Sequence, residues 1–263
     1  GVGVFYLLYN AKLKNIQITQ YQTIFEENDL EIDFVKSAYD WYQLNKIDYW
    51  KSDLFTKDEK VVNNEKVQAT YKDLIERNEG NSKLYFQEQL LNDQLGNKTN
   101  KEVLTELSKI YESNTQGDYK AVIANRMMQL LIDDGKQIEA LAIADQAKAQ
   151  YKKSKFINGL LNTESTVRQS TLGLFFENQT LPNMPIHLVA DAKNVDRFSL
   201  EIFEVLNPID FRNYINDQYN YPFSKLKKTL VRKEDFKVDN KGDYKNYKTS
   251  FEIKGLPSGL YVV

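Results

Sequence analysis

The sequence predicts an α+β fold in two segregated parts, with helices first and antiparallel strands after them. The spacing of the apolar residues changes once, within residues 170–206, and does not change back. Upstream, apolar residues recur at helical spacing. Downstream, Ile186, Leu188 and Ala190 occupy every second position, which is the pattern of a strand with one buried face. A single change of period predicts two layers or two domains.

The chain of 263 residues is long enough for two domains, which we place at 1–165 and 166–263. It contains no cysteine, which excludes disulfides, thiolate metal sites and cysteine nucleophiles from this segment. Its 35 basic and 37 acidic residues nearly balance, which argues against nucleic acid as a partner. No apolar run reaches the ~20 residues of a membrane-spanning helix. Both ends look cut, and the second domain is expected to be incomplete at its C-terminus.

Amphipathic stretches in the first domain predict a series of helices. One extends from Phe5 to about Trp50 and carries aromatic residues at helical spacing. The charged stretch 51–66 has few apolar residues and is interpreted as a connector. Glycine and asparagine directly after an apolar periodic run are helix stop signals. On that basis we expect three further helices, around 67–75, 84–95 and 103–111.

The clearest pair of helices follows. Asp118 is a candidate N-cap for a helix that continues to Gly135, and a second helix is expected over 136–151. The second helix carries alanine at i, i+4 and i+7, in Ala140, Ala144 and Ala147. Small residues at this spacing let a neighbouring helix approach closely, as in tetratricopeptide hairpins. The sequence shows no clean 34-residue repeat, so we predict an array of helical hairpins without a repeat count, ending in a helix near 155–166.

Short strands separated by turn residues predict an antiparallel β-sandwich in the second domain. The segment 239–243 is interpreted as a hairpin turn, and 207–221 as either a loop or a short helix. The expected strands are 186–191, 197–206, 225–231, 247–253 and 260–263.

The chain offers no residue pattern typical of catalysis, so we expect no catalytic, cofactor-binding or metal-binding residues and no enzymatic activity. The single histidine, His187, falls on the polar face of an expected strand. Asp239 and Asp243 resemble part of a calcium loop, but Lys241 stands where a ligand is required and the bidentate glutamate is missing. Neither the phosphate loop nor the dinucleotide, zinc-protease and serine-hydrolase motifs occur.

Three stretches carry a family resemblance: G-K-Q-I-E-A-L-A-I-A-D-Q-A-K, then T-L-G-L-F-F-E-N-Q-T-L-P-N-M-P-I-H-L-V-A-D-A-K-N-V-D-R-F-S-L-E-I-F-E-V, and later F-E-I-K-G-L-P-S-G-L-Y-V-V. From about Tyr71 to Val263 the chain resembles the N-terminal part of bacterial alpha-2-macroglobulin-family proteins of the Bacteroidetes type. Asn194-Val195 matches the turn before an early strand of the first macroglobulin domain. Leu256 to Tyr261 matches its L-P-x-G-x-Y hairpin.

The resemblance implies a non-catalytic scaffold within a protease trap of the bacterial envelope. It implies an exported parent protein, periplasmic or anchored to the outer membrane through a segment outside this one. The partners it implies are proteases, through the full-length protein, and the macroglobulin domains that follow in the same chain. The family's thioester requires a cysteine, so it does not lie in this segment, and no functional residue is carried over.

A different function class stays open beside this one. The aromatic residues within 34–50 fit a surface recognition module whose helical array binds a glycan or a partner protein. That hypothesis expects binding by this segment alone, whereas the scaffold hypothesis expects a segment that is inert by itself.

Overall fold

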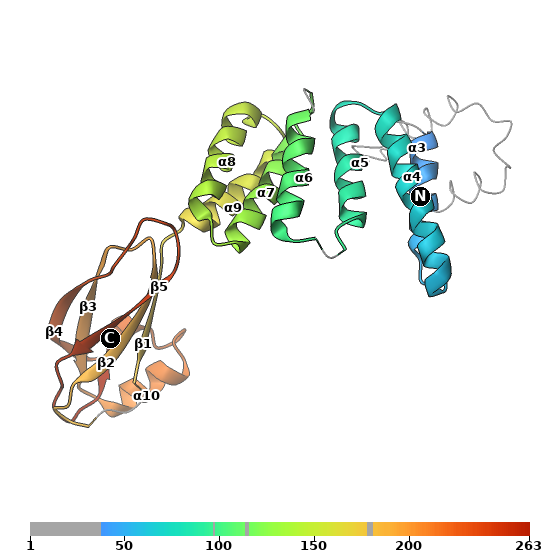
Figure 1. The fold of residues 1–263 in the computed structure, drawn as a ribbon. Helices are drawn as coiled ribbons and strands as arrows, with labels where there is room; N and C mark the ends of the chain where they lie inside the picture. Colours follow the sequence, from blue (N-terminus) through green and yellow to red (C-terminus); the bar gives the residue numbers. More distant parts are fainter. Residues whose placement is uncertain (1–37, 97, 114–115, 178–180) are drawn as a thin grey trace. The chain divides into compact units, whose positions relative to one another are not determined.

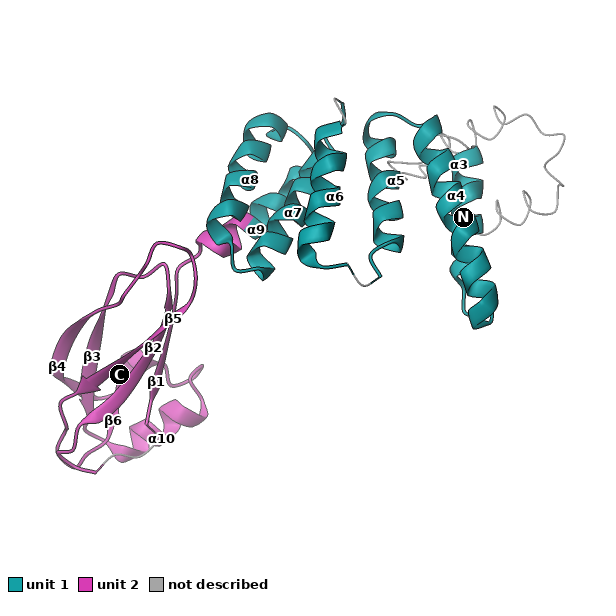
Figure 2. Cartoon of the chain, in the orientation of Figure 1, with its two compact units in different colours: residues 1–163 teal, residues 164–263 magenta. Residues whose placement is uncertain are grey.

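The computed structural model describes residues 38–96, 98–113, 116–177 and 181–263 (Figure 1). The chain forms two compact units, one ending at Thr163 and the other extending from Glu164 to Val263 (Figure 2). Helices α3 to α9 all precede the first strand, which confirms the α+β fold with segregated parts. The helix expected before residue 38 lies outside the described residues.

Helices α3 to α8 of the first unit pack in chain order, with consecutive helices in contact (Figure 1). One core cluster centres on Ile47, Leu74 and Phe86, and a second on Leu107 and Ile123. No helix of the described residues has the length and apolar character needed to cross a membrane. The helices are α3 (Ala38–Lys51), α4 (Lys57–Arg77), α5 (Gly80–Asp93), α6 (Asn100–Ser113), α7 (Lys120–Asp133), α8 (Gln137–Tyr151) and α9 (Ile157–Arg168).

The connector expected over 51–66 is wrong, because α4 begins within it at Lys57. Thr56 is the N-cap and forms a capping box: its hydroxyl accepts from the Glu59 backbone N–H, and the Glu59 carboxylate accepts from the Thr56 backbone N–H over 2.9 Å. This reciprocal pair satisfies two backbone donors that a helix start leaves without partners. Residues 57–66 of the charged stretch are therefore the first part of a 21-residue helix, mostly exposed apart from Asn63.

The N-cap expected at Asp118 is also wrong. Tyr119 holds that position at the start of α7, with no side-chain cap. The Asp118 carboxylate instead accepts a hydrogen bond from Asn81 Nδ2 over 2.7 Å, and the Tyr119 backbone N–H donates to Asn81 Oδ1 over 2.9 Å. One asparagine at the start of α5 thus fixes the entry to α7.

The hairpin of α7 and α8 forms as expected. Gly135 has a φ of 73°, in the left-handed region, and the Lys136 N–H donates to Leu131 O over 2.7 Å, which closes the end of α7. The three alanines expected to allow close helix approach are fully buried, which confirms it at these positions: Ala140, Ala144 and Ala147.

The described strands of the second unit form two three-stranded antiparallel sheets, in the orders β1-β2-β5 and β4-β3-β6. One hydrophobic cluster takes residues from both, including Leu188 and Ile253 from the first sheet and Leu200 and Ile202 from the second. The strands are β1 (Thr171–Phe176), β2 (Ile186–Lys193), β3 (Arg197–Val205), β4 (Lys228–Lys237), β5 (Tyr247–Ile253) and β6 (Tyr261–Val262).

Strand β1 was not predicted, because its sequence T-L-G-L-F-F is apolar on both faces and shows no alternation. Phe175 points outward over Gly173, whereas Leu174 and Phe176 join the core.

The strand expected at 225–231 is β4, which begins at Lys228 and continues to Lys237. Its run of charges suits an edge strand with a single partner, β3.

The segment around 239–243 is not the expected hairpin turn, since β4 and β5 belong to different sheets. It is a connection that crosses from one sheet to the other, in which Gly242 and Tyr244 have φ values of 69° and 62°.

Within 207–221 the structure has a short helix, α10 (Pro208–Asn216), capped by the Asn207 side chain. Helix α10 helps cover a small cluster that includes Val205 and Leu226.

Candidate recognition surface on the helical unit

A hollow of about 400 Å³ lies on the surface formed by α3 and α4. Val67 at its base is buried in the core of the unit, and Trp50 packs against the same core while remaining half-buried. We name this feature the Trp50 hollow. Its lining residues are Trp50, Lys51, Lys60, Val61, Asn64 and Val67.

Lysine ammonium groups lie over the aromatic rings of this surface. Lys46 Nζ is 5.1 Å from the Trp50 ring centroid and 5.3 Å from that of Tyr42, and Lys66 Nζ is 5.9 Å from the Trp50 ring. Contacts of this kind are attractive because the ring face is electron-rich. The surface therefore presents an aromatic residue flanked by cations, which suits an anionic group better than a neutral sugar face.

Acidic side chains neutralise part of this charge. Lys60 Nζ is 2.8 Å from Asp53 Oδ1, and Lys51 pairs with Asp93 of α5. The cations left to attract an anionic partner are therefore chiefly Lys46 and Lys66, each also hydrogen-bonded to a neutral amide oxygen on its own helix.

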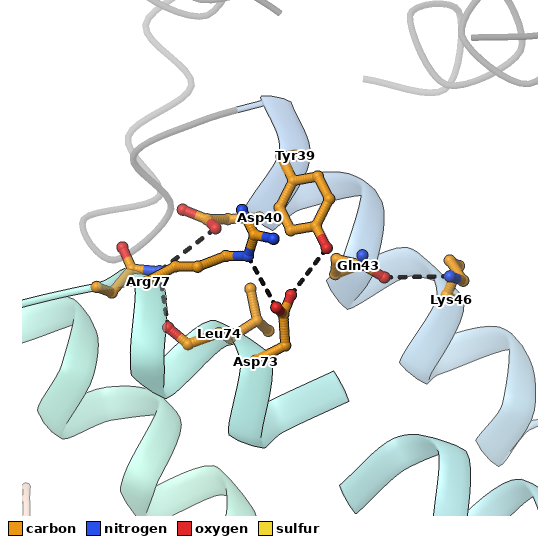
Figure 3. Close-up of polar contacts among 8 residues, drawn as sticks. Tyr39, Asp40, Gln43, Lys46, Asp73, Leu74 and Arg77 are labelled. Carbon is orange, nitrogen blue, oxygen red and sulfur yellow. Dashed lines mark hydrogen bonds and ion pairs between the residues drawn. The ribbon is translucent and has the colours of Figure 1, made fainter. Parts of the chain in front are cut away.

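A polar network joins the start of α3 to the end of α4 (Figure 3). The Tyr39 hydroxyl donates to Asp73 Oδ2 over 2.8 Å, and Arg77 Nε donates to Asp73 Oδ1 over the same distance. The guanidinium of Arg77 also lies 4.5 Å from the Tyr39 ring centroid. The hydrogen bond from Arg77 lowers the pKa of Asp73, and burial followed by the bond to Asp73 raises the pKa of Tyr39.

The same region holds Asp40, a buried carboxylate. Asn78 Nδ2 lies 3.3 Å from Asp40 Oδ1 and also donates to Leu74 O over 2.9 Å, which satisfies a carbonyl at the end of α4 (Figure 3). The network lowers the pKa of Asp73 and raises that of Tyr39, and each of its polar groups is held by a structural partner. Its chemistry fits the attachment of α3 to α4 better than proton transfer.

A second buried network joins α5 to α7. Glu88 accepts from the Tyr119 hydroxyl over 2.5 Å and from Arg126 NH1 over 3.1 Å. Burial, followed by the bond to Glu88, raises the pKa of Tyr119. The residues are more than 30 positions apart, and nothing in the local sequence pattern indicates the contact.

The titratable residues considered from the sequence are not brought together. His187 is exposed on β2, opposite Glu252 of β5. Asp243 accepts from the Tyr247 hydroxyl over 2.5 Å, beside the crossing between sheets. Within the residues that the structure describes, no group of three or more histidine, aspartate or glutamate side chains could hold a metal ion.

Pairs of acidic residues adjacent in the sequence are likewise separated. Glu234 binds Arg232 at 3.2 Å, whereas Asp235 accepts from the Ser199 hydroxyl on the other face of β4. Asp134, at the end of α7, accepts from Asn100 Nδ2 over 3.0 Å. Glu234, Asp235 and Asp134 thus each have a structural partner of their own.

No family model, curated protein or solved structure matches this chain.

Proposed function

We propose that this chain is a non-catalytic scaffold segment of an alpha-2-macroglobulin-like protease trap of the bacterial envelope. In this proposal the helical unit is a tetratricopeptide-like array of hairpins, and the second unit is a macroglobulin-like β-sandwich. The observation that carries the proposal is the order of the parts: stacked helices first, then two antiparallel sheets around one core cluster. It is the order that the family resemblance implies.

Two details of the second unit support this assignment. Asn194, at the turn before β3, has a φ of 55°, and its side-chain amide donates to the carbonyls of Val167, Arg168 and Gln169 at 3.1–3.2 Å. Tyr261, after the Leu256–Gly259 turn, packs against the cluster shared by both sheets. The residues that carry the resemblance therefore have structural roles at a turn and at the end of the core.

A protease trap works by rearrangement: a protease cuts an exposed segment, and the body of the inhibitor then encloses it. A scaffold segment contributes rigid units that hold their shape through this change. Well-packed cores with fully buried anchors, such as Phe86, Leu107, Leu188 and Ile202, suit that role. The proposed partners are the attacking protease, through the full-length protein, and the macroglobulin domains that follow.

The test uses the full-length protein and a broad-specificity protease at sub-stoichiometric ratio. The protease is then assayed on a small peptide and on a large protein substrate. We expect one discrete cut, retained activity on the peptide and lost activity on the large substrate. Progressive degradation with both activities unchanged would refute inhibition by enclosure.

The Trp50 hollow supports a second candidate function, recognition of a glycan or a partner protein by the helical unit. The flanking lysines favour an acidic ligand. A screen of acidic glycans and acidic peptides against this chain tests it, with the double variant Lys46→Glu, Lys66→Glu expected to abolish binding. Lys101→Glu, at an exposed position on α6, is the matched control. Equal binding by both variants would place the ligand elsewhere.

A further inference from the structure

Exposed apolar side chains gather on α10 and on the segments that flank it. We name this surface the α10 patch. It adjoins the end of β3 that β6 leads away from, because the two strands are antiparallel. A cluster of exposed apolar side chains on a folded unit marks a site of interaction. The residues of the patch are Leu206, Ile209, Ile215, Tyr219, Tyr221 and Phe223.

Contacts made by Phe223 join the parts of the patch into one surface. The Phe223 ring centroid lies 5.5 Å from that of Phe203 on β3 and 6.3 Å from that of Tyr214 on α10. The Leu206 N–H donates to Lys227 O over 3.0 Å, which holds the two ends of the segment together. The helix, the loop after it and the end of β3 are therefore neighbours in space.

Helix α10 carries apolar residues on two faces. Phe211 and Tyr214 pack against the small core cluster. Ile209 and Ile215 are 68% and 58% exposed, three residues before and three residues after the exposed Arg212. A helix that covers a core ordinarily has polar residues on its outer face. The two isoleucines therefore contribute little to folding and are free to contact a partner.

Basic side chains surround the patch without matching acidic ones. Residues 206–231 contain four basic and two acidic residues, whereas the whole chain has 35 and 37. Among the described residues, no ion pair includes any of the four, which are Arg212, Lys225, Lys227 and Lys228. Lys228 Nζ lies 3.8 Å from the Phe223 ring centroid, so one of these charges is held beside the apolar surface. This charge favours an anionic partner.

We propose that the α10 patch binds the surface of a lipid bilayer that contains anionic headgroups. Tyr219 is 93% exposed and projects from the unit, as do the isoleucines of α10. The interface of a bilayer accepts projecting side chains of any shape, whereas a protein partner would need a groove that matches them. Tyrosine suits this interface because its ring is apolar and its hydroxyl is polar.

The flanking cations have a role in the same contact, since lysine and arginine beside the inserted side chains attract the phosphates of anionic lipids. The binding is expected to be reversible, because the patch is small and no segment crosses the bilayer. The proposal goes beyond the protease trap and does not depend on it.

The experiment uses a single fluorescent label, which is possible because the chain contains no cysteine. Gln218→Cys, exposed beside the patch, is labelled with an environment-sensitive fluorophore and leaves all six patch residues in place. Lys101→Cys, exposed on α6, carries the same label as the control. Each labelled chain is titrated with large unilamellar vesicles of phosphatidylcholine alone, and with vesicles that contain about one-third phosphatidylglycerol.

We expect the emission of the label at position 218 to move to shorter wavelength with the anionic vesicles only. Lipids with a nitroxide on the acyl chain should quench it, because the label enters the interface. The label at position 101 should respond to neither. High salt should weaken the binding, since salt screens the attraction to the headgroups.

Two pairs of variants separate the apolar from the charged contribution. Ile209→Ser with Tyr219→Ser should weaken vesicle binding by about tenfold or more, whereas Tyr49→Ser with Leu54→Ser, at exposed apolar positions of the helical unit, should leave it unchanged.

Lys225→Glu with Lys227→Glu should also weaken binding by about tenfold or more. Lys57→Glu with Lys101→Glu makes the same change in net charge at exposed positions of the helical unit, and should weaken binding by less than about twofold.

Three results would overturn the proposal. The first is an unchanged emission of the label at position 218 with anionic vesicles, in a chain that is folded by circular dichroism. The second is equal vesicle binding by the patch variants and their controls, because the contact would then lie elsewhere. The third is a response of the same label to soluble polyglutamate but not to vesicles, which would assign the patch to an acidic protein partner.

Discussion

Tyr119 and Glu88, 31 residues apart in the chain, are joined by a hydrogen bond of 2.5 Å from the tyrosine hydroxyl to Oε2 of the carboxylate. Both side chains are buried, at 6% exposure each, and Arg126 binds the other carboxylate oxygen. A carboxylate removed from water needs such partners to remain ionised. The hydrogen bond therefore joins α5 to the start of α7, and neither helix has a group of its own that could take the place of the missing partner.

Tyr119→Phe should lower the free energy of unfolding by about 1–3 kcal/mol, because it leaves a buried charged acceptor without one of its donors. Urea denaturation followed by circular dichroism measures the change. Tyr49→Phe, at a tyrosine that is 57% exposed, is the control and should alter stability by less than about 0.5 kcal/mol. Equal stability of the two variants would show that Arg126 and water suffice for Glu88.

The same tyrosine predicts a loss of stability in alkaline solution. Its pKa in the folded state is raised, so above about pH 10 the unfolded chain releases a proton that the folded chain retains. The stabilisation is complete below that pH and is lost as the pH rises further. Between pH 10 and 11 the wild type should lose up to about 1.4 kcal/mol more than Tyr119→Phe. Parallel losses in urea denaturation would contradict this assignment.

Helices α4 and α6 begin with the same reciprocal hydrogen bonds, which predicts matching effects of mutation. Thr99 and Glu102 repeat the contacts of Thr56 and Glu59, with backbone-to-carboxylate distances of 2.8 and 2.9 Å. Thr56→Ala and Thr99→Ala should each cost about 1 kcal/mol of stability. The hydrogen bonds from each threonine lower the pKa of its partner glutamate, so this contribution is lost as the pH falls through those pKa values. Thermal unfolding at pH 7 and at pH 3 measures it.

If either alanine variant loses as much stability at pH 3 as at pH 7, the carboxylate takes no part in the cap. Thr105→Ala is the control, since its hydroxyl bonds within α6 to Lys101 O rather than at the helix start.

These caps also show how far the sequence predicts this fold. The T-x-x-E pattern of a capping box is present at 56–59 and at 99–102. The start of α4 could therefore have been predicted from the sequence, although the low apolar content of 51–66 suggested a connector. The change from helices to strands was predictable, because the spacing of apolar residues records which face each element buries. Strand β1 was not, because its outward-facing Phe175 hides the alternation.

The polar networks were beyond prediction for a different reason. The Tyr39–Asp73 and Tyr119–Glu88 contacts join residues 34 and 31 positions apart. Such contacts depend on how one helix packs on the next, and no local pattern specifies it.

Close packing of α8 predicts intolerance of larger side chains. Ala144 is fully buried within a helix that packs on α7, so Ala144→Leu adds three carbon atoms where there is no free volume. Overpacking of this kind costs about 1–3 kcal/mol. Ala149→Leu, at an exposed position of the same helix, should be neutral. Thermal unfolding distinguishes the two variants. Equal melting temperatures would mean that α7 and α8 can move apart at Ala144 without loss of stability.

Gly255 predicts a stronger effect in the β unit. A Cβ atom at this position would overlap the backbone of Asn183 and Met184, and the neighbouring Asn183 N–H donates to Leu256 O over 2.7 Å. Gly255→Ala must therefore move one of two backbone segments and break that hydrogen bond. We expect a loss of about 2 kcal/mol or more, because backbone atoms cannot rotate away as a side chain can.

Ser258→Ala, exposed in the same turn, isolates the effect of the overlap from that of any mutation nearby. Arg232 provides a second readout, because its guanidinium donates to Lys254 O and, over 3.3 Å, to Gly255 O. Displacement of Gly255 should weaken these bonds, and NMR shifts of the Arg232 side chain should report it in Gly255→Ala but not in Ser258→Ala. Equal melting temperatures of Gly255→Ala and Ser258→Ala, with unchanged Arg232 shifts, would contradict this prediction. They would show that the 183–184 segment moves without loss of free energy and contributes little to the stability of the sheets.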